Sequence, residues 1–242
     1  MILGITTAPR PDGAEYLGRT IKSSADSGFS DVIVCSEPGT VYPDFTGACG
    51  SGGVQIFPNP EMLGNYGNFK KLAETLLAWS DENEILVTAE DDIEFCSNAA
   101  KKIVDAMQPF LAGREQSKDF GFFAAYSASC HQDHLQSHSL APLKTTSLWG
   151  ACCLVWTRES LRALLDHKIF KEWRGLDDNR PPVGSPKIKH VDTCISKVMD
   201  KLNRKMYFCR PSLVRHVGVV STLRKKAWTP DRDCHDFAGV KK

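Results

Sequence analysis

Three consecutive carboxylates, Glu90, Asp91 and Asp92, follow a short apolar run at 85–87 (Ile-Leu-Val). A run of this kind, too short for a helical period, is typical of the end of a buried strand. Like charges crowded there repel one another and cost stability unless a cation lies among them. A hard divalent ion that carries phosphates is the simplest candidate, because Mg²⁺ or Mn²⁺ takes one or two carboxylates together with substrate oxygens. The alternative is an acidic turn exposed to water.

The composition is that of an ordinary globular protein. The 242 residues, 42% hydrophobic and 24% charged, suffice for one large domain or two small ones. No apolar run approaches the ~20 residues that span a bilayer, and the opening MILGITTAPR lacks the features of a signal peptide. Nine cysteines without a C-x-x-C pair indicate reduced thiols. We therefore expect a cytoplasmic protein without a membrane partner.

Charge is distributed unevenly along the chain. Residues 1–166 carry 12 Lys/Arg against 21 Asp/Glu, a net charge of −9, and residues 167–242 carry 18 against 8, a net charge of +10. A basic carboxyl-terminal third can bind a nucleotide diphosphate or an acidic polymer, although a solvated surface is its commonest meaning.

Apolar periodicity predicts alternating strands and helices in the first half of the chain. Strands are expected at 2–7, 31–35 and 54–57 and again up to 87, and helices at 17–25, 68–79 and 99–110. This order predicts an α/β fold with a right-handed, mostly parallel sheet and helices on both faces. Ligands of such sheets lie beyond the carboxyl ends of the strands. Thr6, Thr7, Arg10, Glu37 and the acidic triplet would meet there.

The second half is less regular. Strands are expected at 121–126 and 206–209, an apolar stretch at 148–156, and helices at 159–165 and from Asp192 onward. Residues 128–147 look irregular. The spacing of His131, His134 and His138 could form a metal-binding helix face, but a mobile loop near the substrate is favoured. The proline-rich stretch 171–190 indicates a long loop or lid, and the tail from residue 224 is basic.

Four segments in this order resemble the nucleotide-sugar-dependent glycosyltransferases of the GT-A fold: ILGITTAPR, the acidic triplet, WGACCLVWTRESLRALL and PSLVRHVGVVST. The resemblance covers about residues 2–223. The last segment is similar to the N-acetylglucosaminyltransferase IV group and to small phage glycosyltransferases, some of which modify hydroxymethylated bases in DNA. The resemblance implies a single domain over 1–242, with a nucleotide-sugar-binding half (1–127), an acceptor and catalytic half (128–223) and a basic tail (224–242).

The resemblance also implies metal ligands. Glu90-Asp91-Asp92 takes the place of the D-x-D motif, with Asp92 as direct ligand of Mn²⁺ or Mg²⁺ and Glu90 or Asp91 nearer the ribose. His216 matches a late ligand of the metal or the diphosphate; the alternative is a structural histidine that caps a strand end.

For the donor, expected to be a UDP-sugar, the resemblance places Thr6, Thr7 and Arg10 beside the nucleotide and Glu37 beside the uracil or ribose. Further residues would face the donor or line the sugar pocket, namely Asn65, Asn68, Lys71, Trp149 and Gly150. The alternatives are that Lys71 is a solvated helix residue and that Trp149 is a core residue.

Asp192 is the expected catalytic base of an inverting transfer, which needs a carboxylate to remove the proton of the acceptor hydroxyl. The alternative is that Asp192 only caps a helix, a role worth ~1 kcal/mol.

Three acceptor hypotheses remain open. Sugar transfer to a hydroxymethylated base in double-stranded DNA leads narrowly, because the basic third could contact phosphates through Arg204, Lys205, Arg210, Arg215, Arg224, Lys225 and Lys226. The second is transfer to a glycan or protein hydroxyl, and the third is a non-catalytic nucleotide-binding module.

Overall fold

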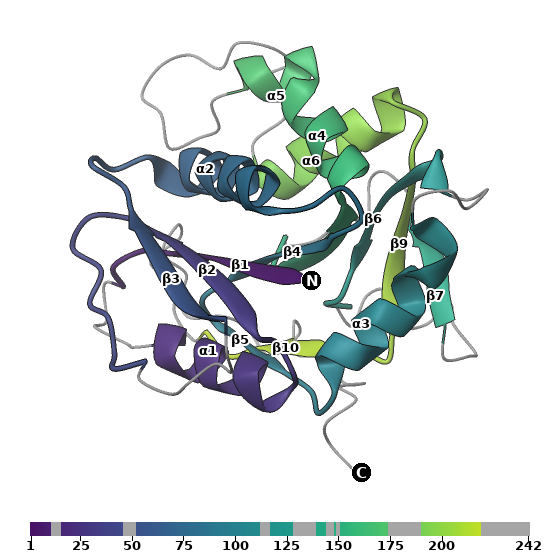
Figure 1. The fold of residues 1–242 in the computed structure, drawn as a ribbon. Helices are drawn as coiled ribbons and strands as arrows, with labels where there is room; N and C mark the ends of the chain where they lie inside the picture. The colour runs from purple at the N-terminus through teal and green to yellow at the C-terminus, as the bar shows by residue number, and fades with distance from the viewer. Residues whose placement is uncertain are drawn as a thin grey trace.

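A mixed eight-stranded sheet forms the centre of the computed structural model, with the strand order β3-β2-β1-β4-β8-β6-β9-β7 (Figure 1). The structure describes residues 1–10, 16–45, 52–111, 117–127, 139–143, 148, 151–173 and 190–218. The strands of the sheet are β1 (Ile2–Thr7), β2 (Asp31–Ser36), β3 (Gly53–Pro58), β4 (Ile85–Glu90), β6 (Phe120–Ala124), β7 (Ser139–Leu143), β8 (Cys153–Thr157) and β9 (Lys205–Arg210).

The sheet is mostly parallel, as predicted, but two strands are reversed. β1 pairs in parallel with β2 and with β4, β2 pairs in parallel with β3, and β6 pairs in parallel with β9. β8 is antiparallel to both β4 and β6, and β7 is antiparallel to β9. The reversal of β8 matters for the site because it brings the start of β8 beside the end of β4, where Ala89 pairs with Cys153.

Helices cover both faces of the sheet, as Figure 1 shows. One face carries α2 (Gly64–Trp79), α4 (Arg158–Asp166), α5 (Lys168–Glu172) and α6 (Val191–Lys201), and the other carries α1 (Tyr16–Asp26) and α3 (Ala99–Met107). Successive strand residues point to opposite faces, so in β4 Leu86 packs into the first layer and Val87 into the second. Burial on both faces explains why the central strands are almost wholly apolar.

A second, two-stranded sheet lies beside the main one and was not predicted. β5 (Ile93–Phe95) pairs antiparallel with β10 (Val214–His216), with His216 opposite Ile93. Strands of three residues have too few positions to show an alternating pattern, so only the pairing of distant segments reveals them.

Several predicted boundaries were wrong. The stretch 128–147, expected to be irregular, contains β7, whose strand conformation depends on its pairing with β9. The helix expected from residue 68 begins at Gly64, because two glycines, poor helix formers, obscure its first turn. The helix expected over 99–110 ends at Met107 and is followed by a 3₁₀ turn, Gln108–Phe110, that contains a proline. The stretch 171–190 begins inside α5, and α6 starts at Val191.

Within the described ranges, the helices are too short or too polar to cross a lipid bilayer.

Candidate functional site

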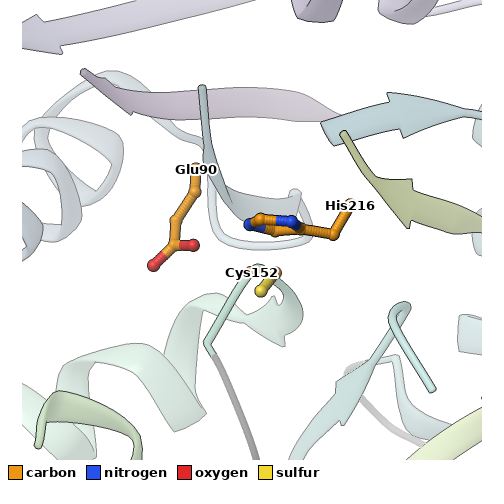
Figure 2. A group of neighbouring side chains, drawn as sticks. All are labelled: Glu90, Cys152 and His216. Carbon is orange, nitrogen blue, oxygen red and sulfur yellow. The ribbon is translucent and has the colours of Figure 1, made fainter. Parts of the chain in front are cut away.

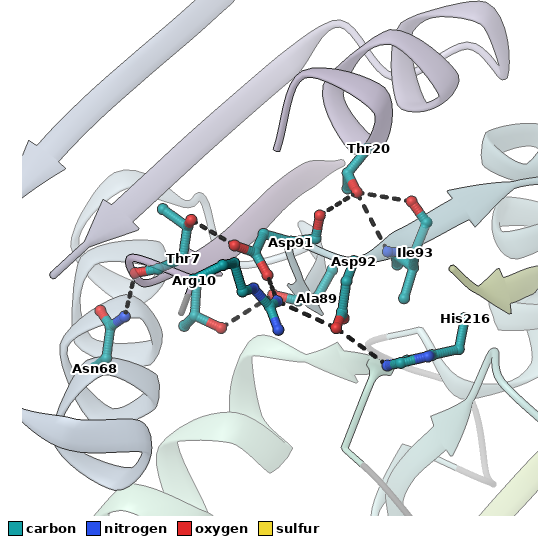
Figure 3. Close-up of polar contacts among 10 residues, drawn as sticks. Thr7, Arg10, Thr20, Asn68, Ala89, Asp91, Asp92, Ile93 and His216 are labelled. Carbon is teal, nitrogen blue, oxygen red and sulfur yellow. Dashed lines mark hydrogen bonds and ion pairs between the residues drawn. The ribbon is translucent and has the colours of Figure 1, made fainter. Parts of the chain in front are cut away.

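The carboxyl ends of β1, β2 and β4 meet at one edge of the sheet, where the register places Thr6 opposite both Cys35 and Glu90. The structure brings Thr7, Arg10, Asp91 and Asp92 together at this edge (Figure 3), directly after Glu90, the last residue of β4. Glu37 follows β2 and is held to the same edge, because its backbone N–H donates to the carbonyl of Thr7 at 3.0 Å. The expected convergence of separate strand ends is therefore present.

Asp91 is buried and held from two sides. The hydroxyl of Thr7 donates to Oδ2 of Asp91 at 2.5 Å, and Nη2 of Arg10 donates to Oδ1. Burial raises the pKa of the Asp91 carboxyl, and the charge of Asp92 adds to this while Arg10 opposes it. With both oxygens engaged by protein groups, Asp91 holds Arg10 in place rather than facing an open site.

Asp92 differs from Asp91 because one of its carboxylate oxygens has no hydrogen-bond partner among the described residues. Its Oδ2 lies 3.1 Å from Nη2 of Arg10 and 3.1 Å from Nε2 of His216, whereas its buried Oδ1 has no hydrogen-bond partner among the described residues. Burial alone would raise the pKa of Asp92, but the hydrogen bond and charge of His216, together with Arg10, lower it. Asp92 is thus an ionised, buried carboxylate with a free oxygen.

Thr20 of α1 shapes the turn that carries the carboxylates. Its hydroxyl lies 2.6 Å from the carbonyl oxygen of Asp91 and 2.7 Å from that of Ile93, and accepts from the N–H of Ile93 at 3.2 Å. This buried side chain satisfies backbone groups that the tight turn between β4 and β5 leaves unpaired. Sequence reasoning missed Thr20, since nothing distinguishes it from other helix residues.

His216 reaches the site through β10. The N–H of Val217 donates to the carbonyl of Asp92 at 2.7 Å and joins the end of β10 to the triplet. Burial would lower the pKa of His216, but its hydrogen bond to Asp92 and the charges of Asp92 and Glu90 raise it. A Cβ atom built on Gly218 would lie 2.3 Å from Oδ2 of Asp92. The chain therefore needs glycine where it passes this carboxylate.

Glu90 lies near both His216 and Cys152 (Figure 2). Its backbone N–H donates to the carbonyl of Cys152 at 2.9 Å, and the ligand atoms of Glu90, Cys152 and His216 lie within 4.8 Å of one another. Burial, with the charge of Asp92, raises the pKa of Glu90 to about 7. Cys152 was not predicted as a site residue, because it lies in an apolar stretch that is typical of the protein core.

These residues fit a divalent cation. The 3.1 Å between Oδ2 of Asp92 and Nε2 of His216 is a hydrogen bond in this structure. In an octahedral site with metal–ligand bonds of about 2.1 Å, neighbouring ligands lie about 3 Å apart, so a cation could replace the shared proton with little movement of either side chain. The buried Oδ1 of Asp92, which has no hydrogen-bond partner among the described residues, and the excess of negative charge also favour a bound cation. Asp92 and His216, the two predicted metal ligands, therefore lie side by side.

Two other residues predicted to contact the donor, Glu37 and Asn68, are buried and hydrogen-bonded to the backbone near the carboxylates. Glu37 is buried, and its Oε2 accepts from the N–H of Leu63 at 2.9 Å. Asn68 is buried as well: its amide donates to the carbonyl of Thr7 at 3.1 Å and accepts from Asn59 at 3.0 Å. Asn59, which sequence reasoning missed, therefore helps to fix the end of β1.

Some predicted residues do not join this cluster. Lys71 is exposed on α2 and Asn65 is half-buried at its start, and in the described part of the chain no hydrogen bond or ion pair links either side chain to the carboxylates. Trp149, Gly150 and the three histidines at 131, 134 and 138 lie outside the described residues, as do Arg224, Lys225 and Lys226.

Asp192 is the second residue of α6, and its Oδ1 accepts from the N–H of Thr193 at 2.6 Å. The N-cap position belongs to His190, so Asp192 is not the N-cap itself, although its carboxylate satisfies one of the N–H groups that the first turn of the helix leaves unpaired. Burial, Glu90 and Asp92 raise the pKa of Cys152, and the charge of Asp192 contributes to this rise. Asp192 therefore lies close enough to Cys152, the neighbour of Glu90, to act on its thiol electrostatically.

No protein-family profile and no curated protein matches the chain. Among solved structures, it is similar to TarS of S. aureus, with a TM-score of 0.55 and 9% identity over 90% of this chain and 37% of TarS. It is also similar to GalNAc-T7 in a complex with UDP, GalNAc and Mn²⁺, with a TM-score of 0.54 and 11% identity over 96% of this chain and 46% of GalNAc-T7. A structure of TarS 1–349 with UDP has a TM-score of 0.50 and 10% identity.

The chain thus spans less than half the length of TarS and of GalNAc-T7. At identities this low, the likeness concerns the fold. It confirms the predicted GT-A fold.

Proposed function

We propose that this protein is a metal-dependent glycosyltransferase that moves a sugar from a UDP-sugar to an acceptor hydroxyl. The observation that carries the proposal is the contact between Asp92 and His216 at the carboxyl end of β4, with Oδ1 of Asp92 left open. The GT-A fold supports it, because similar structures were solved with UDP or with UDP, GalNAc and Mn²⁺.

In this proposal Asp92 and His216 hold the ion, Mn²⁺ or Mg²⁺. The bound ion would neutralise the charge that builds on the departing diphosphate. Arg10 is pinned between Asp91 and Asp92, so its position at the edge of the sheet is fixed before a ligand arrives. Thr7 and Asn68 fix the end of β1 in turn. The site is therefore largely formed in advance, which spares a ligand the cost of ordering it.

The residues proposed to bind the donor lie at the same edge of the sheet. Thr6, Thr7 and Arg10 border the nucleotide in this proposal, and Glu37, buried behind Leu63, lies on the side of the uracil or ribose. Glu90, half-buried at the end of β4, offers carboxylate oxygens that can accept a hydrogen bond from a ribose hydroxyl.

Asp192 is the proposed base of an inverting transfer. It would take the proton of the acceptor hydroxyl while that oxygen attacks the anomeric carbon, so it must lie within hydrogen-bond reach of the acceptor. Asp192 is half-buried at the start of α6, and its charge acts on Cys152, whose carbonyl accepts from the N–H of Glu90; this placement supports the role.

A hydroxymethylated base in DNA is the acceptor that the basic third favours. The structure weakens this argument, because Arg204 lies 2.7 Å from Glu159, Lys205 lies 3.4 Å from Asp119, and Arg215 lies 2.5 Å from Glu94. Phosphates would have to compete with these carboxylates. This observation favours the second candidate, transfer to a glycan or protein hydroxyl, in which the basic residues need not contact the acceptor.

One experiment tests the function and separates the acceptors. The protein is incubated with Mn²⁺, a panel of UDP-sugars, and either hydroxymethylated duplex DNA or a glycan and peptide library, and products are read by mass spectrometry. A sugar-sized mass gain on any acceptor supports the proposal. Neither transfer nor donor hydrolysis with any UDP-sugar would leave only a non-catalytic module. Binding of duplex DNA that weakens steeply with salt would favour the DNA acceptor.

A further inference from the structure

Cys152 is a buried thiol at the site that the proposed function does not use. Figure 2 shows its sulfur beside the gap between the Glu90 carboxylate and the edge of the His216 ring, and the ligand atoms of all three lie within 4.8 Å of one another. Hard ions such as Mg²⁺ and Mn²⁺ prefer oxygen ligands and gain little from sulfur. A hard-ion site therefore gives no reason for a thiol at this point.

We propose that Glu90, Cys152 and His216 form a binding site for a thiophilic divalent cation of the Zn²⁺ class. Thiolate, imidazole and carboxylate are the three ligand types that Zn²⁺ takes in proteins, at bond lengths of about 2.0–2.3 Å. Tetrahedral ligands at those lengths lie about 3.5 Å apart. From their present separations of at most 4.8 Å, the three ligand atoms would have to approach one another by up to about 1.3 Å.

The surroundings favour such an ion in two ways. The backbone of Cys152 is fixed against β4 by the 2.9 Å hydrogen bond from Glu90, so the thiol is already placed beside the carboxylate. The nearby carboxylates of Asp91 and Asp92 add negative charge that a divalent cation offsets; within the described ranges their ion pairs are with Arg10 and His216. On coordination the Cys152 S–H bond breaks, the sulfur forms a bond to the metal, and the proton leaves to solvent.

His216 belongs to both metal sites, so a thiophilic ion and a hard ion compete for it. Zn²⁺ is then expected to inhibit the transfer reaction, a consequence that rests on the proposed function. Binding itself does not rest on it, because the three ligands come from this chain alone.

The test uses the metal-free protein without nucleotide, sugar or acceptor. Cd²⁺ is titrated while the ultraviolet charge-transfer band of a thiolate–metal bond is followed, and Zn²⁺ affinity is measured by calorimetry. Wild type is compared with Cys152→Ser, with His216→Ala, and with Cys153→Ala as a control, since the adjacent Cys153 is buried but contributes no atom to the group. Circular dichroism establishes that each variant is folded, and Cys152→Ala replaces Cys152→Ser if the latter is not.

The proposal predicts one equivalent of Cd²⁺ with a charge-transfer band in wild type and Cys153→Ala, and loss of that equivalent in Cys152→Ser. Zn²⁺ affinity should fall there by more than the roughly 10–100-fold that loss of an outer partner of a metal ligand costs. An unchanged band and Zn²⁺ affinity in folded Cys152→Ser or Cys152→Ala would overturn the proposal. Because no donor is present, a negative result here leaves the transferase proposal standing, and absence of transfer leaves this one standing.

Discussion

The side chains of Asp92 and His216 meet although they come from distant parts of the chain: Nε2 of His216 lies 3.1 Å from Oδ2 of Asp92. The register of the small sheet fixes this contact, because His216 pairs with Ile93, the residue after Asp92. The contact joins the carboxyl end of the central strand β4 to β10, the last described strand.

The stability of the metal-free protein is expected to fall as pH rises from 4.5 to about 7 and beyond. Burial, with the charge of Asp92, raises the pKa of Glu90 from 4.5 to about 7, and Asp92 raises the pKa of His216 against the effect of burial. Both groups keep protons in the folded state that the unfolded chain releases at lower pH. The unfolded state therefore binds fewer protons, and stability falls with pH. The lowered pKa of Asp92 acts only in a more acidic range.

Urea denaturation in EDTA at a series of pH values measures this slope. Glu90→Gln should flatten it, whereas Glu74→Gln, at an exposed position of α2, should not. A wild-type stability that stays constant or rises over the window would show that these two groups are not buried as described.

Thr20→Val should destabilise the protein by about 1–3 kcal/mol, because removal of the hydroxyl leaves buried backbone groups of Asp91 and Ile93 without their partner. Thr20→Ser, which keeps the hydroxyl, is the matched control and should lose less. Equal losses in the free energy of unfolding for the two variants would assign the role of Thr20 to its methyl group.

Gly218→Ala should weaken metal binding by roughly 10–100-fold, the range seen when support of a metal ligand is lost. The added Cβ would lie 2.3 Å from Oδ2 of Asp92 and 2.9 Å from Cε1 of His216, so both side chains must shift. Gly18→Ala is the control, since its Cβ meets the ring of Pro43 at 3.2 Å, away from the carboxylates. Mn²⁺ binding followed by electron paramagnetic resonance gives the affinities. Equal values for Gly218→Ala and wild type would place the ion elsewhere.

Asp192→Asn should lower the transfer rate by about 10²–10⁴-fold, the usual contribution of a positioned base, while folding and UDP binding stay unchanged. Asp200→Asn, at an exposed position of the same helix, is the control. Normal turnover by Asp192→Asn would remove this residue from the mechanism.

Much of the fold could be predicted because its strands are buried on both faces. The predicted strand at 2–7 coincides with β1, and the apolar run at 85–87 lies inside β4. Local patterns did not reveal the reversal of β8, the strand β7 or the pair β5 and β10, because the direction and pairing of a strand depend on partners far away in the sequence. These elements decide the site, since β8 brings Cys152 and β10 brings His216.

The site residues likewise divide into those that a local sequence pattern indicates and those that only contacts between distant segments reveal. Carboxylates are conspicuous after an apolar strand, so the sequence itself makes Asp91 and Asp92 candidates. Thr20, Asn59 and Cys152 were not, because a buried threonine, asparagine or cysteine carries no signal until its partners are known. His216 was found through a resemblance, and its place beside Asp92 became visible only in the structure.

The central claim is that a divalent cation held at Asp92 joins the nucleotide to this edge of the sheet. Calorimetric titration of UDP into wild type and Asp92→Asn, with Mn²⁺ and with EDTA, tests it most directly; Asp119→Asn, at an exposed position near Lys205, serves as the control. The account predicts that Mn²⁺ strengthens UDP binding in wild type and Asp119→Asn, and that this gain disappears in Asp92→Asn. The same UDP affinity with Mn²⁺ and with EDTA in wild type, or an undiminished gain in Asp92→Asn, would contradict it.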